Sequence, residues 1–131
     1  MSHHIVIVDD DRDIVDILAE AFDGEGFETI TFQDGAAALE HILADPPALV
    51  LTDLVMPGLS GGLLVERLRA VYGPELPIVV MSASLHLSGF TSLDVQAFLS
   101  KPFDLNELLE VISGYVRAPS TMPSTIRMRC R

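Results

Sequence analysis

The sequence predicts an α/β fold in which helices cover both faces of a five-stranded parallel sheet. Short, continuous apolar runs alternate along the chain with segments whose apolar residues recur at helical spacing, which is typical of such a sheet. The 131 residues, of which 49% are hydrophobic and 21% charged, are enough to bury one core. We therefore expect one doubly wound α/β domain with the strand order 2-1-3-4-5.

The N-terminal third contains the first two strand and helix pairs. An apolar, β-branched run predicts a strand over residues 5–8, and apolar residues at helical spacing predict a helix over 14–22 that ends before Gly24. A weaker strand over 27–32 is followed by an alanine-rich helix over 36–44, which two prolines close.

The middle of the chain continues the alternation. A strand over residues 48–52 has Asp53 at its end, and a Pro-Gly turn follows. Apolar residues that include Val71 predict a helix over 64–71, stopped by a Gly-Pro pair. The fourth strand covers residues 77–82.

The last units are less even. A short fifth strand covers residues 97–100, and the final helix has Asp104 as N-cap, Glu107 three residues later, and an apolar face that reaches Val116. Between strands four and five, residues 85–95 are rich in Ser, Gly and Thr and nearly free of charge, so we expect an atypically short fourth helix there.

The charge of the chain argues against a nucleic-acid-binding function. The net charge is -11, and the chain up to residue 116 carries all 19 acidic residues, so the folded body is not expected to bind nucleic acid. Half of the basic residues lie at the C-terminal end: Arg117, Arg127, Arg129 and Arg131. The run from residue 118 to 125 is rich in Pro, Ser and Thr and is typical of a tail, so we expect residues 1–117 to form the domain and residues 118–131 a flexible tail or linker remnant.

The lengths of the apolar runs, the start of the chain and the number of cysteines predict the cellular location. The apolar runs are too short to span a bilayer, and the start of the chain has no room for a signal peptide before the first strand. The single cysteine, Cys130, cannot form an internal disulfide. We expect a cytoplasmic protein without membrane contact.

Reactive side chains follow several of the predicted strands. Asp9 and Asp10 follow the first strand, Asp53 the third, Ser82 ends the fourth, and Lys101, the only lysine in the chain, follows the fifth. The carboxyl ends of parallel strands share one edge of the sheet, and with this strand order the first and third strands are neighbours. Crowded carboxylates repel one another unless they share a cation, and hard oxygen ligands favour Mg²⁺.

The same edge suits phosphoryl chemistry. A cation, an ammonium and a hydroxyl can together surround the oxygens of a phosphoryl group in flight, which leaves Asp53 as the acceptor of an aspartyl phosphate. The sequence here resembles the receiver domain of two-component response regulators over about residues 4–116. The matching motifs are Ile7-Val8-Asp9-Asp10, Leu51-Thr52-Asp53-Leu54-Val55-Met56-Pro57 with Gly61, Val80-Met81-Ser82-Ala83, and Phe98-Leu99-Ser100-Lys101-Pro102-Phe103.

The resemblance implies a flavodoxin-like fold and a role for each motif residue. Asp10, Asp53 and the main-chain carbonyl of Val55 bind Mg²⁺ directly, and Asp9 helps through water. Asp53 accepts the phosphoryl group, with Ser82 and Lys101 as its partners in the catalytic site.

The resemblance also implies a conformational switch. On phosphorylation the Ser82 hydroxyl moves toward the phosphoryl group and the aromatic Phe98 turns inward. The Lys101-Pro102 peptide bond is expected to be cis, which proline permits. Two departures from the family stand out: Phe98 replaces the common tyrosine, and the spacing from Ser82 to Lys101 is about one helical turn shorter than usual.

The resemblance names partners by class. A histidine kinase or a histidine phosphotransfer protein supplies the phosphoryl group, a downstream protein target reads the altered surface, and a homodimer is also allowed. Leu85, Leu87, Phe90 and Leu93 form a candidate apolar docking patch. Val55 and Ser84 stand where the family controls the hydrolytic water, and Val55 cannot orient water, so we expect slow self-dephosphorylation.

Other functions remain open at this point. The domain is either a stand-alone receiver or one excised from a longer regulator or hybrid kinase. A metal-dependent phosphohydrolase with an aspartyl nucleophile is a different class, but Val55 stands where such enzymes carry the acid/base aspartate. We therefore expect a signalling domain without enzymatic turnover. A nucleotide or flavin binder is disfavoured because Asp9 and its neighbours repel phosphate.

Two further sets of residues have simpler interpretations. Asp11 and Asp13 are expected only to cap and polarise the first helix. His3 and His4 are adjacent, so their side chains point to opposite sides of an extended chain, and we expect a solvated terminus and no shared metal site.

Overall fold

The structure is a computed structural model that describes residues 4–82 and 94–116. Its strands are β1 (Ile5–Val8), β2 (Thr29–Phe32), β3 (Leu49–Asp53), β4 (Ile78–Ser82) and β5 (Ala97–Ser100). Its helices are α1 (Arg12–Gly24), α2 (Gly35–Ala44), α3 (Gly61–Tyr72), the short 3₁₀ helix η1 (Gly73–Glu75) and α4 (Leu105–Ser113).

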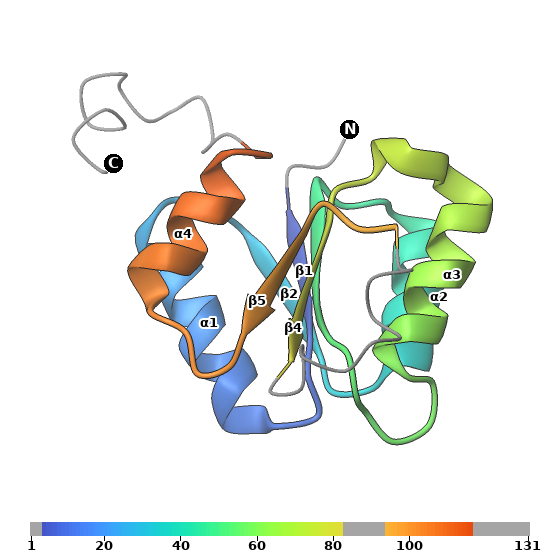
Figure 1. Ribbon diagram of the computed structural model, residues 1–131, viewed down its shortest axis with the longest axis horizontal. Helices are drawn as coiled ribbons and strands as arrows, with labels where there is room; N and C mark the ends of the chain where they lie inside the picture. Colours follow the sequence, from blue (N-terminus) through green and yellow to red (C-terminus); the bar gives the residue numbers. More distant parts are fainter. Residues whose placement is uncertain (1–3, 83–93, 117–131) are drawn as a thin grey trace.

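The strands form one parallel sheet in the order β2-β1-β3-β4-β5. Helices α1 and α4 cover one face, and α2 and α3 cover the other (Figure 1). The predicted fold class and strand order are confirmed. Strand order reverses between β1 and β3, and the carboxyl ends of strands at such a point are where open α/β sheets bind ligands.

Burial on both faces explains why the strands read as continuous apolar runs. All four residues of β1 are fully buried: Ile5 and Ile7 pack toward α1 and α4, whereas Val6 and Val8 pack toward α2 and α3. β3 and β4 are buried along their whole length as well. These three central strands form a rigid platform whose polar residues lie only at the carboxyl ends.

A side-chain cap starts each α-helix of the described residues, and the cap predicted at Asp104 is confirmed. Asp11, Asp34, Ser60 and Asp104 each accept a hydrogen bond from a main-chain N–H in the first turn of the helix that follows. The interpretation of Asp11 as a helix cap is therefore confirmed. Such caps typically stabilise a protein by about 1 kcal/mol each.

Some element boundaries and exposures differ from the prediction. β2 begins at Thr29, later than predicted. Phe27 lies before the strand and packs edge-to-face on Phe22 of α1. The final helix ends at Ser113, short of Val116. Val71, expected on the buried face of α3, is 59% exposed.

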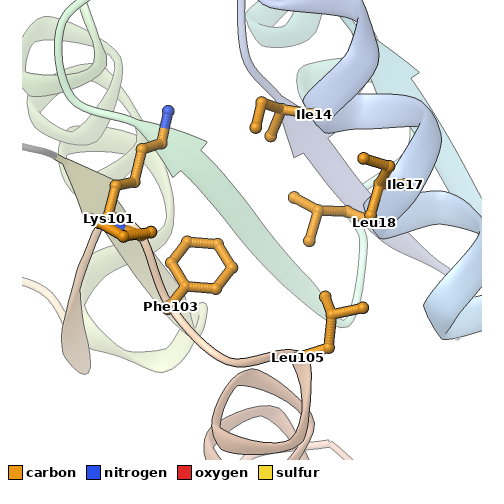
Figure 2. Close-up of a pocket in the computed structure, with 7 residues that line it drawn as sticks. Ile14, Ile17, Leu18, Lys101, Phe103 and Leu105 are labelled. Carbon is orange, nitrogen blue, oxygen red and sulfur yellow. The ribbon is translucent and has the colours of Figure 1, made fainter.

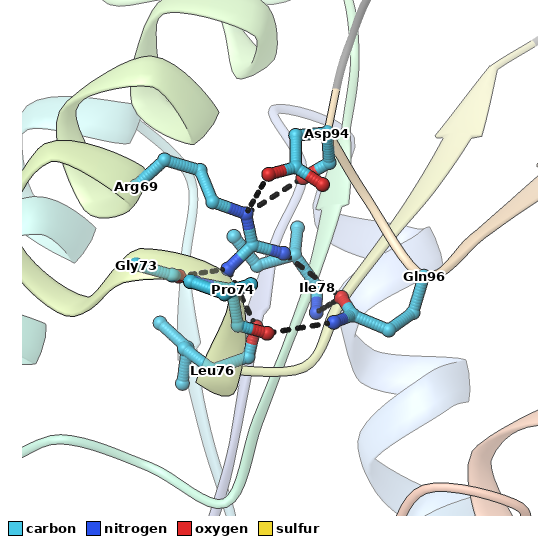
Figure 3. Close-up of polar contacts among 7 residues, drawn as sticks. All are labelled: Arg69, Gly73, Pro74, Leu76, Ile78, Asp94 and Gln96. Carbon is cyan, nitrogen blue, oxygen red and sulfur yellow. Dashed lines mark hydrogen bonds and ion pairs between the residues drawn. The ribbon is translucent and has the colours of Figure 1, made fainter.

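Arg69 of α3 ties together the segments around the start of β4. Its guanidinium donates to the main-chain oxygens of Gly73, Leu76 and Asp94 at 2.7 to 2.8 Å. It also donates to the side chain of Gln96, whose Oε1 accepts the Ile78 amide (Figure 3). Burial lowers the pKa of Arg69, with Asp94 opposing that shift.

Several expectations lie outside the described residues. These are the short fourth helix, the apolar patch of Leu85, Leu87, Phe90 and Leu93, the role of Ser84, and the tail over 118–131. Among the residues that are described, no helix has the length and apolarity needed to cross a membrane.

His4 contradicts the expectation of a solvated terminus. It is 1% exposed, and its ring meets that of His41 on α2. The main-chain oxygen of His4 accepts the Ala48 amide at 2.8 Å, which extends the β1–β3 pairing by one residue and draws His4 into the fold. Burial lowers the pKa of His4 below its ordinary value.

Candidate functional site

Three carboxylates meet at the carboxyl edge of the sheet. Asp9 and Asp10 follow β1, and Asp53 is the last residue of the neighbouring β3. One oxygen from each lies within 4.8 Å of the others. Asp9 is fully buried and Asp53 is 8% exposed, whereas Asp10 is open to solvent. The predicted carboxylate cluster is thus assembled, with two members fixed inside the protein and one at its mouth.

Lys101 reaches the cluster from β5. Its Nζ atom lies 2.8 Å from Oδ2 of Asp9 and 3.5 Å from Oδ2 of Asp53. The second oxygen of Asp9 accepts the Asp11 amide at 2.9 Å. The peptide bond from Lys101 to Pro102 is cis. Asp9 is therefore fully engaged, and Asp53 is the carboxylate with the longer contact to the ammonium.

The charges perturb one another. Burial raises the pKa of Asp53, and the neighbouring charge of Asp9 raises it further, while Lys101 and the Leu54 amide offset part of the rise. Burial alone lowers the pKa of Lys101, but its contacts with Asp9 and Asp53 outweigh that effect, so the pKa is raised above 10.5. Three carboxylates beside one ammonium leave the edge with an excess of negative charge, which a divalent cation could neutralise.

The oxygen donors fit a hard cation. The cluster offers carboxylates only, and Mg²⁺ takes one or two carboxylates while it keeps several waters. Val55 follows Asp53 by two residues, and its side chain is 65% exposed.

The remaining predicted residues are placed separately. Ser82 is the last residue of β4 and is 2% exposed, one position beyond Met81, which pairs with Asp53. Phe98 on the edge strand β5 is 36% exposed. The structure thus brings Ser82 to the carboxyl edge and leaves Phe98 on the outer surface of the sheet.

Gly61 allows α3 to start directly against the backbone of Asp53 and Leu54. Its amide donates to the main-chain oxygen of Leu54 at 2.9 Å. A Cβ atom at this position would lie 2.0 Å from the main-chain oxygen of Asp53 and 2.8 Å from Cα of Leu54. Both are backbone atoms, so any larger residue would push the helix away from Asp53. This explains the glycine at position 61.

An apolar groove adjoins the site. It lies between α1 and the start of α4, has a volume of about 350 Å³, and is lined by Ile14, Ile17, Leu18, Lys101, Pro102, Phe103 and Leu105 (Figure 2). Ile17 is 50% exposed and Leu105 is 37% exposed. Sequence reasoning missed this groove because α1 and α4 meet only in the fold. Lys101 lines the groove and also contacts Asp9 and Asp53.

Comparison with known proteins identifies the family. The model of the response regulator receiver domain matches residues 5–113. The chain belongs to the response regulator receiver family. This is a signalling domain, as the resemblance of the motifs implied.

Two longer regulators are similar to this chain in sequence. The response regulator MprA from Mycobacterium ulcerans is 37% identical over 120 residues, which cover 89% of this chain and 51% of MprA. The DNA-binding transcriptional regulator NtrC from Escherichia coli K12 is 34% identical over 109 residues, which cover 81% of this chain and 23% of NtrC. The chain thus spans about a quarter to a half of the length of these relatives.

Solved structures agree on the fold. The response regulator TrrA from Thermotoga maritima, in complex with Mg(2+)-BeF, superposes with a TM-score of 0.80 at 28% identity and covers 87% of this chain and 99% of that one. A CheY-like receiver domain protein from Methanospirillum hungatei has a TM-score of 0.79 at 28% identity, covering 87% of this chain and 93% of that one.

Proposed function

We propose that this receiver accepts a phosphoryl group on Asp53 in a Mg²⁺-dependent reaction and signals through protein–protein contacts that depend on it. The observation that carries the proposal is the meeting of Asp53 with Asp9, Asp10 and Lys101 at one edge of the sheet. TrrA, which is similar in fold and sequence, is a regulator solved with Mg(2+)-BeF, and this supports the same kind of ligand here.

The transfer is a displacement at phosphorus. A carboxylate oxygen of Asp53 forms the new P–O bond while the P–N bond of a phosphohistidine breaks, and the leaving imidazole nitrogen keeps the electron pair and takes up a proton. Asp10, Asp53 and the Val55 carbonyl would hold Mg²⁺, with Asp9 helping through water, and the ion would supply charge neutralisation. Lys101 stabilises the oxygens of the transferred group, because its ammonium is already 3.5 Å from Asp53.

The proposed switch uses Ser82 at the carboxyl edge and Phe98 on the edge strand β5. Ser82 turns its hydroxyl toward the new phosphoryl group, and Phe98 moves inward from its partly exposed position. Phe98 has no hydroxyl, so it reports the state through packing alone. A downstream protein then reads the surface around β5 in a monomer or a homodimer.

The apolar groove supports the choice of phosphodonor. A donor histidine must come within bonding distance of Asp53, and the groove lies next to Lys101 at the same edge. We propose that a helix of a histidine kinase or a phosphotransfer protein docks there, with an apolar side chain over Ile17 and Leu105. The acidic side chains of α1, such as Asp13 and Asp16, favour a helix with basic residues.

Location and context complete the proposal. We place the receiver in the cytoplasm. It acts either alone or as one domain of a longer regulator or hybrid kinase, and the second option is supported by relatives that extend well beyond the matched region. A phosphohydrolase is less well supported, since Val55 and not an acid/base group follows Asp53 by two positions. The body remains unsuited to nucleic acid because of its charge.

The test is the mass of the intact protein after incubation with a small-molecule phosphodonor and Mg²⁺. We expect the gain of one phosphoryl group, and no gain with chelator or in Asp53→Asn. Asp16→Asn, which removes a carboxylate outside the cluster, serves as the matched control and should gain the group normally. An equal gain in Asp53→Asn would refute the assignment of the acceptor.

A further inference from the structure

A second cluster of metal-ligating side chains lies at the amino edge of the sheet, opposite the carboxylate site. His4 precedes β1, His41 lies in the last turn of α2, and Asp45 caps the end of that helix. One ligand atom from each residue lies within 4.8 Å of the others. Phosphoryl transfer at Asp53 makes no use of these residues.

The two imidazole rings approach each other through the same ring nitrogen, Nε2. Nε2 of His4 lies 3.2 Å from Nε2 of His41, and the ring planes are inclined by 76°. Two nitrogens bound to one tetrahedral zinc at 2.0–2.1 Å are separated by about 3.3 Å. The imidazole pair therefore already has the ligand spacing of a zinc site.

The fold positions each ligand. The backbone of His4 is held by the Ala48 amide, and the side chain is 1% exposed. The ring of His41 packs against Phe32, with 5.4 Å between ring centroids. Asp45 is the C-cap residue of α2, and one of its carboxylate oxygens lies within 4.8 Å of a ring nitrogen of His4 and of His41. Its exposed side chain can approach the imidazoles by rotation and leaves a coordination position for water.

We propose that His4, His41 and Asp45 bind one Zn²⁺ ion, with water as the fourth ligand. Imidazole nitrogen selects zinc over magnesium, which favours oxygen donors, so the two edges of the sheet bind different metals. The ion would tie the start of β1 to the end of α2. The alternative is a hydrogen bond between two neutral imidazoles, which requires no metal.

The test is a Zn²⁺ titration of the untagged chain against a chromophoric chelator, with excess Mg²⁺ present to occupy the carboxylate cluster. We expect one Zn²⁺ per chain. His41→Gln should weaken binding more than about tenfold, since loss of even an outer-shell partner often costs that much. Asp45→Asn changes an exposed side chain, so it tests the same site without disturbing the core.

Matched variants locate the ion. His86→Gln removes a histidine that is not part of the described cluster, His3→Gln removes the neighbour of His4, and both should bind Zn²⁺ normally. Asp53→Asn should also bind it, which separates this proposal from the proposed phosphoacceptor function. The proposal would be overturned if the wild-type chain bound no Zn²⁺ in the presence of excess Mg²⁺. It would also be overturned if His41→Gln and Asp45→Asn both bound Zn²⁺ as tightly as wild type, or if His3→Gln weakened binding as much as His41→Gln does.

Discussion

The Lys101 ammonium lies 2.8 Å from a carboxylate oxygen of Asp9, a residue 92 positions earlier in the chain. This ion pair joins the ends of β1 and β5 across the two strands between them. Because Asp9 also accepts the Asp11 amide, it is anchored on both oxygens. The contact of Lys101 with Asp53 is the longer of the two, at 3.5 Å.

Lys101 is expected to control the rate of phosphoryl transfer. Lys101→Gln removes the one cation beside the carboxylates in the described structure, and we expect transfer from a small-molecule donor to slow by about a hundredfold. The measurement is the time course of intact mass. Lys101→Arg keeps the charge and should recover part of the rate. A wild-type rate in Lys101→Gln would contradict the role given to this residue.

Asp53 should make stability depend on pH in the absence of Mg²⁺. Its pKa is raised above 3.8 by burial and by Asp9, so the folded state binds more protons there than the unfolded state does. The free energy of unfolding therefore falls as pH rises through the raised pKa. Chemical denaturation of wild type and Asp53→Asn across mildly acidic and neutral pH isolates this term. The variant should be relatively more stable at neutral pH, and a variant that loses stability there would contradict the assignment.

Mg²⁺ should stabilise the fold through the carboxylate cluster. A ligand that binds only the native state at a hundred times its dissociation constant adds about 2.7 kcal/mol to the free energy of unfolding. Asp10→Asn removes one carboxylate of the cluster and should abolish the rise in melting temperature. Asp10 is exposed, so this substitution leaves the core intact. Asp16→Asn should retain the rise. An equal rise in both variants would place the cation elsewhere.

The start of α3 provides a paired test of packing against the acceptor. Gly61→Ala should lower the free energy of unfolding by about 1–3 kcal/mol, because the new Cβ collides with the backbone of Asp53 and Leu54. Gly62→Ala is the matched control, since the nearest atom to a Cβ there is 3.9 Å away. It should be neutral or stabilising by up to about 1 kcal/mol. Denaturant titration of both variants settles the comparison, and equal effects would contradict it.

Val55 is expected to prolong the phosphorylated state. Its exposed valine side chain cannot hydrogen-bond a hydrolytic water, so Val55→Asn should speed loss of the phosphoryl group from the purified protein. The decay of phosphorylated intact mass after donor removal measures this. Decay in Val55→Asn that is no faster than in wild type would refute the hypothesis.

Much of the carboxyl edge could be predicted from sequence, and the physical reason is topological. Asp9, Asp10, Asp53 and Lys101 each follow a short apolar strand, and parallel strands bring such positions to one edge whatever the details of packing. The role of Gly61 could be expected only by resemblance, because the close approach to Asp53 depends on how α3 is seated.

The sequence alone could not predict contacts between side chains that are far apart along the chain. The meeting of His4 with His41 depends on where α2 ends relative to the start of β1, and no periodicity encodes that. The hydrogen bonds of Arg69 likewise join segments on both sides of β4. Val71 shows the limit of helical spacing, because an apolar residue near the end of α3 lies beyond the edge of the core.

The central claim is that Asp53 carries the phosphoryl group, and chemical trapping tests it most directly. After phosphorylation with Mg²⁺ present, borohydride reduces an aspartyl phosphate to homoserine, and peptide mass spectrometry locates the product. The account predicts homoserine at position 53 and unmodified Asp9 and Asp10. Homoserine at position 9 or 10, or a phosphoryl group on a residue other than an aspartate, would contradict it.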